Sequence, residues 1–399
     1  MMQKKQKTLQ KARRRHNMAE CVLAVDVGST ALKAALIDRE GKVASICSLP
    51  YSAPENRYVA EGWIWALKGA VDKLMPVDEA LRQAQGPQSL AQGPQSLAQG
   101  PQALAQRPQV KALAISGNGP TLVSESGLTL RWNEYPAARL NIDETSPDEA
   151  HEFSNSIFLP RILLFRDLIS DEYEASSHLF SGPEYLIWQL TGNAVTILPE
   201  PRYETAYWNR EVLEGFGIMT GKMPDFVELG HNCGSLLPNA QELLGLGDIP
   251  VIGVGPDFIA ALIGTETTEA GRICDRAGSS EGINMCVDKE IRAEGVRTLP
   301  GVKAGLWNIS VLIPDSASLP EDLRLQKVVD GLMLLKKLAA ENDITFPNVI
   351  TTTGGQAKNE AYFEKKRAAL AKLGLELVVG SCVDAELEGD AKVAWSQLA

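Results

Sequence analysis

The stretch "CVLAVDVGSTALKAALID", Cys21 to Asp38, decides the expected fold. Apolar residues lead into Asp26, a Gly-Ser-Thr triplet follows, and a second apolar run continues to the next aspartate. Short apolar runs on either side of a glycine turn predict two neighbouring strands, Val22–Val27 and Ala31–Asp38. An ordinary hairpin has the same outline. The acid and the small hydroxyl residues therefore have to be interpreted from the rest of the chain.

The bulk composition limits the fold and the partners. A chain of 399 residues is longer than one typical domain, so we expect two domains. The hydrophobic share of 44% and charged share of 22% are those of a globular protein. A net charge of −11 argues against non-specific nucleic-acid binding. The sequence has no apolar run of the ~18 residues that a membrane span needs. We therefore expect neither a nucleic-acid nor a membrane partner, and a cytoplasmic location.

The six cysteines and four histidines show no metal-binding spacing. They are dispersed along the chain, without a CxxC pair. Zinc sites need closely spaced pairs of such ligands. Reduced, buried thiols are the expected state of the cysteines.

Two segments differ from the rest in composition. Residues 1–20 carry seven Lys and Arg before the first acid, Glu20. This predicts a basic disordered tail, with Met18 as an alternative start, and a basic arm that contacts RNA or anionic lipid is the second interpretation. Residues 84–109 repeat "AQGPQSL" with a period of seven. Proline in every unit prevents a coiled coil, so we interpret this low-complexity segment as a surface insertion, with a Pro/Gln recognition tract as the alternative.

The remaining pattern predicts an α/β fold, because short apolar strands alternate with helical segments. Further strands are expected at Val110–Ser116, Thr121–Ser124, Val251–Val254, Val349–Thr353 and Leu375–Val379. Helices are expected at Trp63–Leu81, Ile157–Asp167, Pro183–Leu190, Phe258–Gly264, Leu325–Glu341, Glu360–Leu373 and Asp390–Leu398. The segment Leu36–Val43 is typical of a hairpin turn.

The first glycine turn contains residue types that bind phosphate and magnesium. Gly28 lets a ligand approach the backbone, and Ser29 and Thr30 add hydroxyl donors. Asp26 could hold a hydrated Mg²⁺, a cation that prefers oxygen ligands. Lys33 could neutralise phosphate, or lie on the surface of the second strand. Neither GxxxxGK[ST] nor GxGxxG is present, so this is not a P-loop or a dinucleotide fingerprint.

Three later stretches repeat the combination of a strand and a glycine turn. In residues 249–265 a buried strand ends in glycines, and Asp257 then opens an apolar helix, either as an N-cap or as a general base at a domain cleft. Residues 278–282, "GSSEG", form a hydroxyl- and glycine-rich loop that could contact phosphate. In residues 348–379 a strand is followed by Gly354-Gly355 and a helix, which is either a plain β–α turn or a place for a nucleobase or ribose.

The order of these turns resembles the actin-like ATPase superfamily and, within it, the FGGY carbohydrate kinases of the xylulose, glycerol and gluconate kinase type. Other stretches are similar to that family, among them "EGWIWALKGAVDKL", "RWNEYPAAR" (Arg131–Arg139) and "GPEYLIWQLTGN". The resemblance runs from about Cys21 to Ala399 and leaves out the repeat.

The resemblance implies two ribonuclease-H-like α/β domains, 21–265 and 266–399, around a cleft that binds ATP and Mg²⁺. The implied activity is ATP-dependent phosphorylation of a hydroxyl of a sugar, polyol or sugar acid, with a homodimer as an expected assembly. A catalytically impaired sugar- or nucleotide-binding pseudokinase is the alternative. By position, Asp257 would be the catalytic base and Asp26 the metal ligand. The nucleotide would be held by Gly28, Ser29, Thr30, Lys33, Gly278, Ser279, Ser280, Gly354 and Gly355. The sugar would meet Asn118, Glu134 and Asp257.

The sequence departs from the family pattern at several points. Asn118 stands where a xylulose-kinase-like pocket has Gln, and Glu134 replaces an aspartate. Glu281 follows the second phosphate loop where a small residue is usual, and a carboxylate there repels ATP unless it points away or meets a cation. After "VLIPDSASLPEDLR" the chain continues directly into "LQKVVDGLMLLKKLAAE", which predicts a second domain shortened relative to the family.

Overall fold

The structure is a computed structural model that describes residues 20–76, 108–134, 156–380 and 382–398. The predicted basic tail, 1–20, lies outside these residues except for Glu20, which begins the first strand, and the predicted repeat insertion, 84–109, lies outside them except for 108–109. The end of the "RWNEYPAAR" stretch, from residue 135, also lies outside them. The helix expected at Trp63–Leu81 ends earlier than predicted, at Leu74.

The first sheet is built on the opening stretch. Its strand order is β10-β11-β4-β1-β2-β3. The strands are β1 (Glu20–Val27), β2 (Ala31–Asp38), β3 (Val43–Pro50), β4 (Gln109–Gly117), β10 (Asn232–Ser235) and β11 (Pro250–Pro256). β1 and β2 form an antiparallel hairpin in which Asp26 lies opposite Lys33, and β4 runs parallel to both β1 and β11. The carboxyl ends of β1, β4 and β11 therefore meet at one edge of the sheet.

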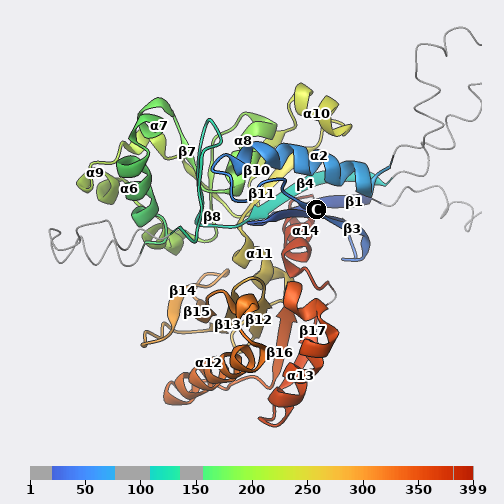
Figure 1. Ribbon diagram of the computed structural model, residues 1–399, viewed down its shortest axis with the longest axis vertical. Helices are drawn as coiled ribbons and strands as arrows, with labels where there is room; N and C mark the ends of the chain where they lie inside the picture. The colour runs from blue at the N-terminus through green and yellow to red at the C-terminus, as the bar shows by residue number, and fades with distance from the viewer. Residues whose placement is uncertain (1–19, 77–107, 135–155, 381, 399) are drawn as a thin grey trace, which may run out of the picture.

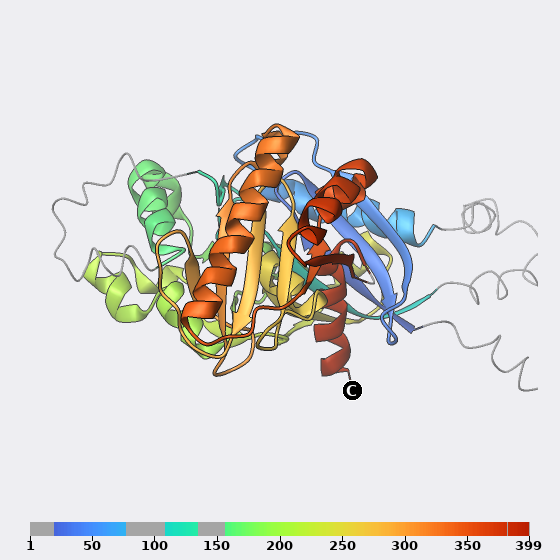
Figure 2. The same ribbon diagram turned by 90° about the horizontal axis from the view of Figure 1, so that it is seen from below.

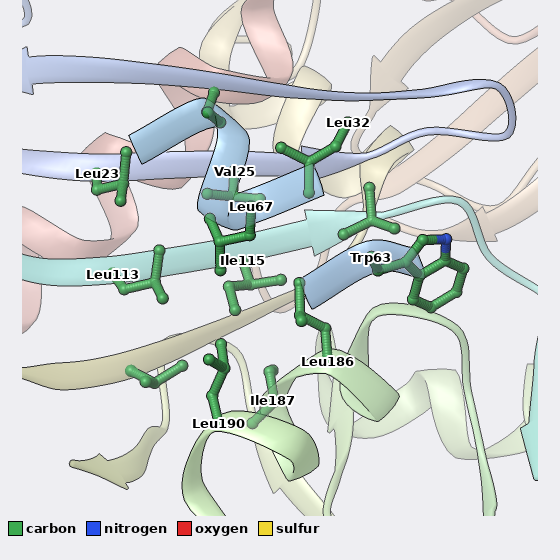
Figure 3. Close-up of a cluster of buried hydrophobic side chains, with 14 of the residues drawn as sticks. Leu23, Val25, Leu32, Trp63, Leu67, Leu113, Ile115, Leu186, Ile187 and Leu190 are labelled. Carbon is green, nitrogen blue, oxygen red and sulfur yellow. The ribbon is translucent and has the colours of Figure 1, made fainter. Parts of the chain in front are cut away.

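Helices cover both faces of this sheet. On one face, Leu23 and Val25 of β1 pack toward α2 (Trp63–Leu74) and α8 (Pro183–Thr191), as Figure 3 shows, and α10 (Pro238–Leu244) extends this layer. On the other face, the alternate residues of β1 pack against the C-terminal helix α14 (Ala385–Gln397). This alternation is the period of two that a strand buried on both sides requires. It sends the side chain of Asp26 to the α14 face.

Two glycines let α11 (Asp257–Gly264) and α14 cross with their backbones in contact. A Cβ atom on Gly264 would lie 1.9 Å from the carbonyl oxygen of Ala385, and one on Gly389 would lie 1.9 Å from that of Ala260. Any side chain at either position would force the helices apart. The two helices lie between the two sheets, and α14 brings the end of the chain back to the first sheet (Figure 1).

The second sheet has the strand order β14-β15-β13-β12-β16-β17. Its strands are β12 (Ile273–Ala277), β13 (Glu281–Val287), β14 (Arg297–Pro300), β15 (Trp307–Ile313), β16 (Val349–Thr353) and β17 (Glu376–Val379). The helices α12 (Glu321–Glu341) and α13 (Glu360–Ala371) lie side by side on one face and share an apolar core with the sheet (Figure 2).

A lobe of short elements extends from the first sheet. It contains α6 (Leu159–Leu168), α7 (Ser170–Ala175), α9 (Arg210–Gly215) and the small strands β5 (Leu122–Ser124), β6 (Thr129–Leu130), β7 (Leu179–Phe180), β8 (Thr196–Leu198) and β9 (Phe226–Glu228). The 3₁₀ helices η1 (Val59–Gly62), η5 (Pro201–Ala206), η6 (Thr220–Lys222), η7 (Ser316–Ser318) and η8 (Gly355–Lys358) are turns between longer elements. The lobe has its own aromatic core around Phe158, Tyr207 and Trp208.

The α/β class with two sheet-containing parts is confirmed, and several boundaries differ from the prediction. α14 begins at Ala385 rather than Asp390, because its acidic first turn is buried rather than part of a loop. α12 begins at Glu321 rather than Leu325, directly after Pro320. All six cysteines lie in the described ranges and none is joined in a disulfide; five are buried, as expected, and Cys47 is half-buried. Among the described residues, no helix combines the length and the apolar character that a membrane crossing requires.

Candidate active site at the junction of the two sheets

A cluster of charged side chains begins at the carboxyl end of β1. The Nζ atom of Lys33 lies 3.2 Å from Oδ2 of Asp26, its partner in the hairpin register. The same Nζ atom lies 3.4 Å from Oδ1 of Asp384, just before α14. The hairpin therefore brings together the two charged residues that the sequence singled out, and links them to the other end of the chain.

The second part of the cluster lies at the start of α11. Asp257 is the first residue of this helix, the cap position is Pro256, and no side chain caps the helix. Its Oδ1 atom lies 3.4 Å from Nη2 of Arg276 on β12, and that nitrogen lies 4.0 Å from Oε1 of Glu386 on α14. Asp257 therefore makes contacts between elements, which an N-cap alone would not explain.

Both helices on the α14 face direct their N-termini toward this cluster. Asp257 lies in the first turn of α11, and Glu386 lies in the first turn of α14. Unpaired N–H groups and the helix dipole make such ends favourable for negative charge. The same physics favours the carboxylates here and favours a phosphate brought close to them.

Burial and neighbouring charges shift the pKa values of the cluster. Burial raises the pKa of Asp26 to about 7, against the opposing effect of Lys33. The pKa of Asp257 is also raised, by burial first, although Arg276 lowers it. Burial lowers the pKa of Lys33, but Asp26, Glu386 and Asp384 together raise it above its usual range. The acids therefore have a higher affinity for protons than free aspartates, whereas Lys33 remains a cation.

A further buried acid lies behind the cluster. Asp390 on α14 is completely buried and accepts a hydrogen bond of 3.1 Å from the hydroxyl of Ser116 on β4. Ser116 is the residue that lies opposite Asp26 in the pairing of β4 with β1. Burial, followed by the charge of Asp26, raises the pKa of Asp390 well above its usual value. This favours a protonated carboxyl that makes a neutral hydrogen bond with Ser116.

The first glycine turn closes on itself and contacts the predicted sugar segment. The N–H of Gly28 donates to the carbonyl oxygen of Ala31 at 3.1 Å. Ser29 Oγ accepts a hydrogen bond of 2.9 Å from the indole N–H of Trp132, which belongs to the "RWNEYPAAR" stretch. Thr30 is exposed. The predicted phosphate turn and the start of the predicted sugar segment therefore lie together.

A small cavity separates this turn from the neighbouring elements. It has a volume of about 10 Å³ and is lined by Gly28, Ser29, Val59, Trp63, Asn118, Thr121, Thr129 and Arg131. Asn118 is held by its own contacts, because its side-chain amide donates to the carbonyl oxygen of Val27 and accepts from Thr121. Glu134 lies in a turn closed by its N–H and the carbonyl oxygen of Arg131, and it is not among the lining residues. The cavity has room for about one water molecule.

The second predicted phosphate loop, Gly278–Ser280, is tied down by neighbouring segments. The side-chain amide of Gln356 donates to the carbonyl oxygen of Gly278 at 2.6 Å. The backbone N–H of Asp315 donates a hydrogen bond to Ser280 Oγ. The backbone N–H of Ala317 donates to the carbonyl oxygen of Ser279. Two segments outside the loop thus determine its shape.

The Gly354-Gly355 turn lies against the Gly278–Ser280 loop. Gly354 has a positive φ of 97°, and a Cβ atom there would lie 2.6 Å from the carbonyl oxygen of Ala277, so only glycine fits. The N–H of Gly354 donates to the carbonyl oxygen of Val383. The next residue, Asp384, forms the ion pair with Lys33. Gly355 has open space where a side chain would be. A continuous series of contacts therefore connects the glycine turns at 28–30, 278–280 and 354–355 with the charged cluster.

The unexpected acid beside the second loop has a cationic partner. Glu281 is completely buried and, with Asp275 of β12, forms ion pairs with Lys366 of α13. Asp275 also accepts a hydrogen bond from Thr352 at 2.9 Å. Burial, followed by the charge of Asp275, raises the pKa of Glu281 to about 8. The carboxylate that the sequence placed beside ATP is instead part of the core of the second sheet.

The residues present fit a magnesium ion that is held mainly by its nucleotide. Oδ1 of Asp26 is buried and has no hydrogen-bond partner, so an acceptor is available beside the turn. Within the described ranges, no group of three or more acidic, histidine or cysteine side chains is arranged to hold a metal ion. Magnesium commonly takes only one or two protein carboxylates and completes its shell with phosphate oxygens and water.

Sequence reasoning missed several residues of this region, among them Arg276, Asp384, Glu386, Gln356 and Lys366. Asp384, Glu386 and Lys366 are charged residues that become buried only when distant elements meet. A signal was present for Glu386, because acids occur at every second position from Asp384 to Asp390 at the start of an apolar helix. No local pattern marks Arg276 or Lys366.

Comparisons with known proteins agree with this architecture. No protein-family model matches the chain. Xylulose kinase of Escherichia coli (strain K12) is 20% identical over a match that spans 67% of this chain and 54% of the relative. The match thus covers about half the length of that curated relative.

Solved structures of three sugar, sugar-acid and polyol kinases have the same fold. Xylulose kinase and gluconate kinase from Lactobacillus acidophilus superpose with TM-scores of 0.67 and 0.68, at 14% and 13% identity. They cover 95% and 96% of this chain, and 90% of each is covered in return. Plasmodium falciparum glycerol kinase, solved with ADP, has a TM-score of 0.68 at 12% identity, with 95% of this chain and 90% of that one covered.

The fold is that of the actin-like ATPases, with two sheet-containing parts. Within that class, these comparisons confirm the resemblance to the FGGY carbohydrate kinases. The domain limits and the shortened second domain stay predictions.

Proposed function

We propose that the protein is an ATP-dependent carbohydrate kinase that phosphorylates a hydroxyl of a sugar, polyol or sugar acid. One observation carries the proposal. Asp26 and Asp257, the two acids that the resemblance assigns to metal binding and proton transfer, share one charged cluster with Lys33 and Arg276. Glycine turns from both sheets connect to that cluster. The kinase names of the relative and of the structural neighbours support the same reaction class.

Phosphoryl transfer requires mainly positioning and charge neutralisation. The sugar hydroxyl oxygen forms a bond to the γ-phosphorus, the bond from that phosphorus to the β–γ bridging oxygen breaks, and ADP leaves with the electron pair. The hydroxyl proton passes to the carboxylate of Asp257. The raised pKa of Asp257 makes it a better proton acceptor than an exposed aspartate.

Lys33 and the first turn would face the transferred phosphate. Lys33 keeps its charge in the cluster, and about a quarter of its side chain (28%) is exposed and open to a ligand. Mg²⁺ bound with the nucleotide would supply charge neutralisation, with Asp26 as its protein ligand. Ser29, Gly28 and Asn118 line the adjoining cavity, and this supports a sugar site on the first-sheet side. The cavity must widen to admit a sugar, which domain closure and opening would permit.

The test is a coupled assay of ADP release over a panel of ketoses, polyols and sugar acids with Mg²⁺. Asp257→Asn removes the proton acceptor while keeping its size. We expect sugar-stimulated turnover to fall by about 10²- to 10⁴-fold in this variant. Asp248→Asn is the matched control, because Asp248 is exposed at the other end of β11. Wild-type turnover that survives in Asp257→Asn would overturn the assignment of the base.

A catalytically impaired sugar- or nucleotide-binding protein is the second candidate, and one observation favours it. Hydrogen-bonding groups of the Gly278–Ser280 loop are already engaged by Gln356, Asp315 and Ala317. The same panel separates the two functions. Measurable ATP binding by calorimetry without turnover on any member of the panel would reject the kinase and support the second candidate.

A further inference from the structure

Arg276 connects three elements that meet at the candidate site. It lies on β12 of the second sheet, two residues before Gly278. Its guanidinium reaches Asp257 at the start of α11 and Glu386 at the start of α14, at 3.4 and 4.0 Å. Because α11 and α14 pack on the first sheet, this one side chain joins the predicted base to the strand that leads into the second glycine loop.

Polar atoms of Arg276 and of its partner Glu386 lack hydrogen bonds, which is unfavourable for a purely structural ion pair. Its Nε atom and Oε2 of Glu386 are both buried without a hydrogen-bond partner. Unsatisfied buried polar atoms cost about 1–3 kcal/mol each, so this arrangement adds little stability. Arg276 is also about one-fifth exposed (21%).

We propose that Arg276 is a positioning residue that holds the Asp257 carboxylate in one orientation relative to the Gly278–Ser280 loop. The inference rests on the proposed kinase function. In-line transfer requires the proton acceptor and the phosphate-binding groups to keep a fixed distance, and an error of about 1 Å can cost about 10²-fold in rate. The guanidinium ties the acceptor to the same strand that ends at the loop, so one side chain sets this distance.

The charges around Asp257 give the sign of the expected effect. Arg276 of β12 and Lys33 of β2 favour its ionised form, whereas Glu386 of α14 and Asp26 of β1 disfavour it. Asp390 of α14 also faces Asp257, but as a protonated carboxyl it adds no charge. Without Arg276, the two charged acids act against a single cation. The pKa of Asp257 therefore rises, and the ionised base is lost at higher pH than in the wild type.

The experiment compares Arg276→Gln and Arg276→Lys with the wild type. For Arg276→Gln we expect kcat to fall by about 10²-fold and the acidic limb of kcat/KM to move up by about one pH unit. The KM for ATP should change little, and Arg276→Lys should restore part of kcat and most of the pH profile. Arg272→Gln, an exposed arginine just before the same strand, is the matched control and should leave all of these unchanged.

A readout that needs no turnover separates this inference from the proposed function. The carboxylate of Asp257 is titrated by ¹³C NMR in wild type and in Arg276→Gln, with the signal assigned by its loss in Asp257→Asn. An upward shift in Arg276→Gln supports the positioning contact, even if no sugar is phosphorylated and the kinase proposal fails. An unchanged Asp257 titration overturns the inference, as does a lower melting temperature combined with an unchanged pH profile.

Discussion

The two candidate phosphate loops differ in what already holds them. Within the described residues, the first turn accepts two hydrogen bonds from outside: the indole N–H of Trp132 donates to Ser29 Oγ at 2.9 Å, and the N–H of Tyr51 donates to the carbonyl oxygen of Thr30 at 3.0 Å. The second loop, Gly278–Ser280, accepts three hydrogen bonds, one from Gln356 and two from the segment 315–317. We therefore expect the second loop to be the more rigid of the two and the first turn to be the more adaptable part of the site.

The buried acids of the two parts differ in the same direction. Glu281 beside the second loop is neutralised by Lys366. Glu184, at the start of α8 under the first sheet, has no ion-pair partner among the described residues, and its Oε2 atom lacks a hydrogen bond. Burial raises the pKa of both acids to about 8. The core of the second part nevertheless places a cation beside its acid, whereas the apolar core under α8 leaves Glu184 without one in the described part of the chain.

The connection between β15 and α12 explains why the second loop needs this support. The sequence predicts a shortened domain at this connection, and residues 315–317 of the short link lie against the loop. Gln356 also donates to Ser316 and accepts a hydrogen bond of 2.7 Å from Arg324. The link is therefore attached to the loop by a polar network.

Lys366→Met should give the largest effect. It leaves Asp275 and Glu281 buried without their cation, and breaking a buried pair in this way costs about 3–5 kcal/mol. We expect the free energy of unfolding to fall by that amount in urea denaturation. Lys365→Met is the matched control, because its ion pairs are exposed and contribute little. Equal effects of the two variants would contradict the contrast between a charge-fixed and an apolar part.

Gln356→Ala should come next. It removes three buried hydrogen bonds, to Gly278, Ser316 and Arg324, each worth about 1 kcal/mol, so the unfolding free energy should fall by about 3 kcal/mol. Because the loop loses its fixed shape, ATP affinity measured by calorimetry should fall several-fold.

The exposed Gln326→Ala on α12 is the control for this change and should leave both quantities as they are. An increase in ATP affinity in Gln356→Ala would show that the network obstructs the nucleotide. That result would reverse the comparison between the two loops and favour the non-catalytic function.

Sequence reasoning identified the parts of the site that follow continuous apolar runs. Asp26 and Lys33 were placed correctly in the fold because two such runs flank the first turn. The strand β12 was missed because Asp275 and Arg276 make it look like a surface loop. Both charges find partners on other elements, and only the packing of the sheet against α11, α13 and α14 creates those partners.

The local signal was also insufficient for roles that depend on distance. Glu281 was expected to repel ATP unless it points away or meets a cation, and the cation it meets, Lys366, is 85 residues away in the chain. Asp257 had two interpretations, as cap or base, that the same residue type satisfies. Such choices are settled by which side chain approaches from another strand or helix, and a single sequence does not contain that information.

The smallest of the three effects is a pH dependence that tests the first part. Burial raises the pKa of Glu184 to about 8 in the folded protein, above its value in the unfolded chain. Its contribution to stability is therefore complete below the unfolded pKa and is lost as the pH rises through about 8. Between about pH 6 and 8, wild type should lose about 2 kcal/mol more of its unfolding free energy than Glu184→Gln, which has no charge to bury. Glu174→Gln, on the exposed side of α7, should follow the wild type, so urea titrations at both pH values isolate the buried acid. Parallel pH profiles for wild type and Glu184→Gln would mean that Glu184 does not titrate with a raised pKa, and the difference between the two parts would then be confined to their loops.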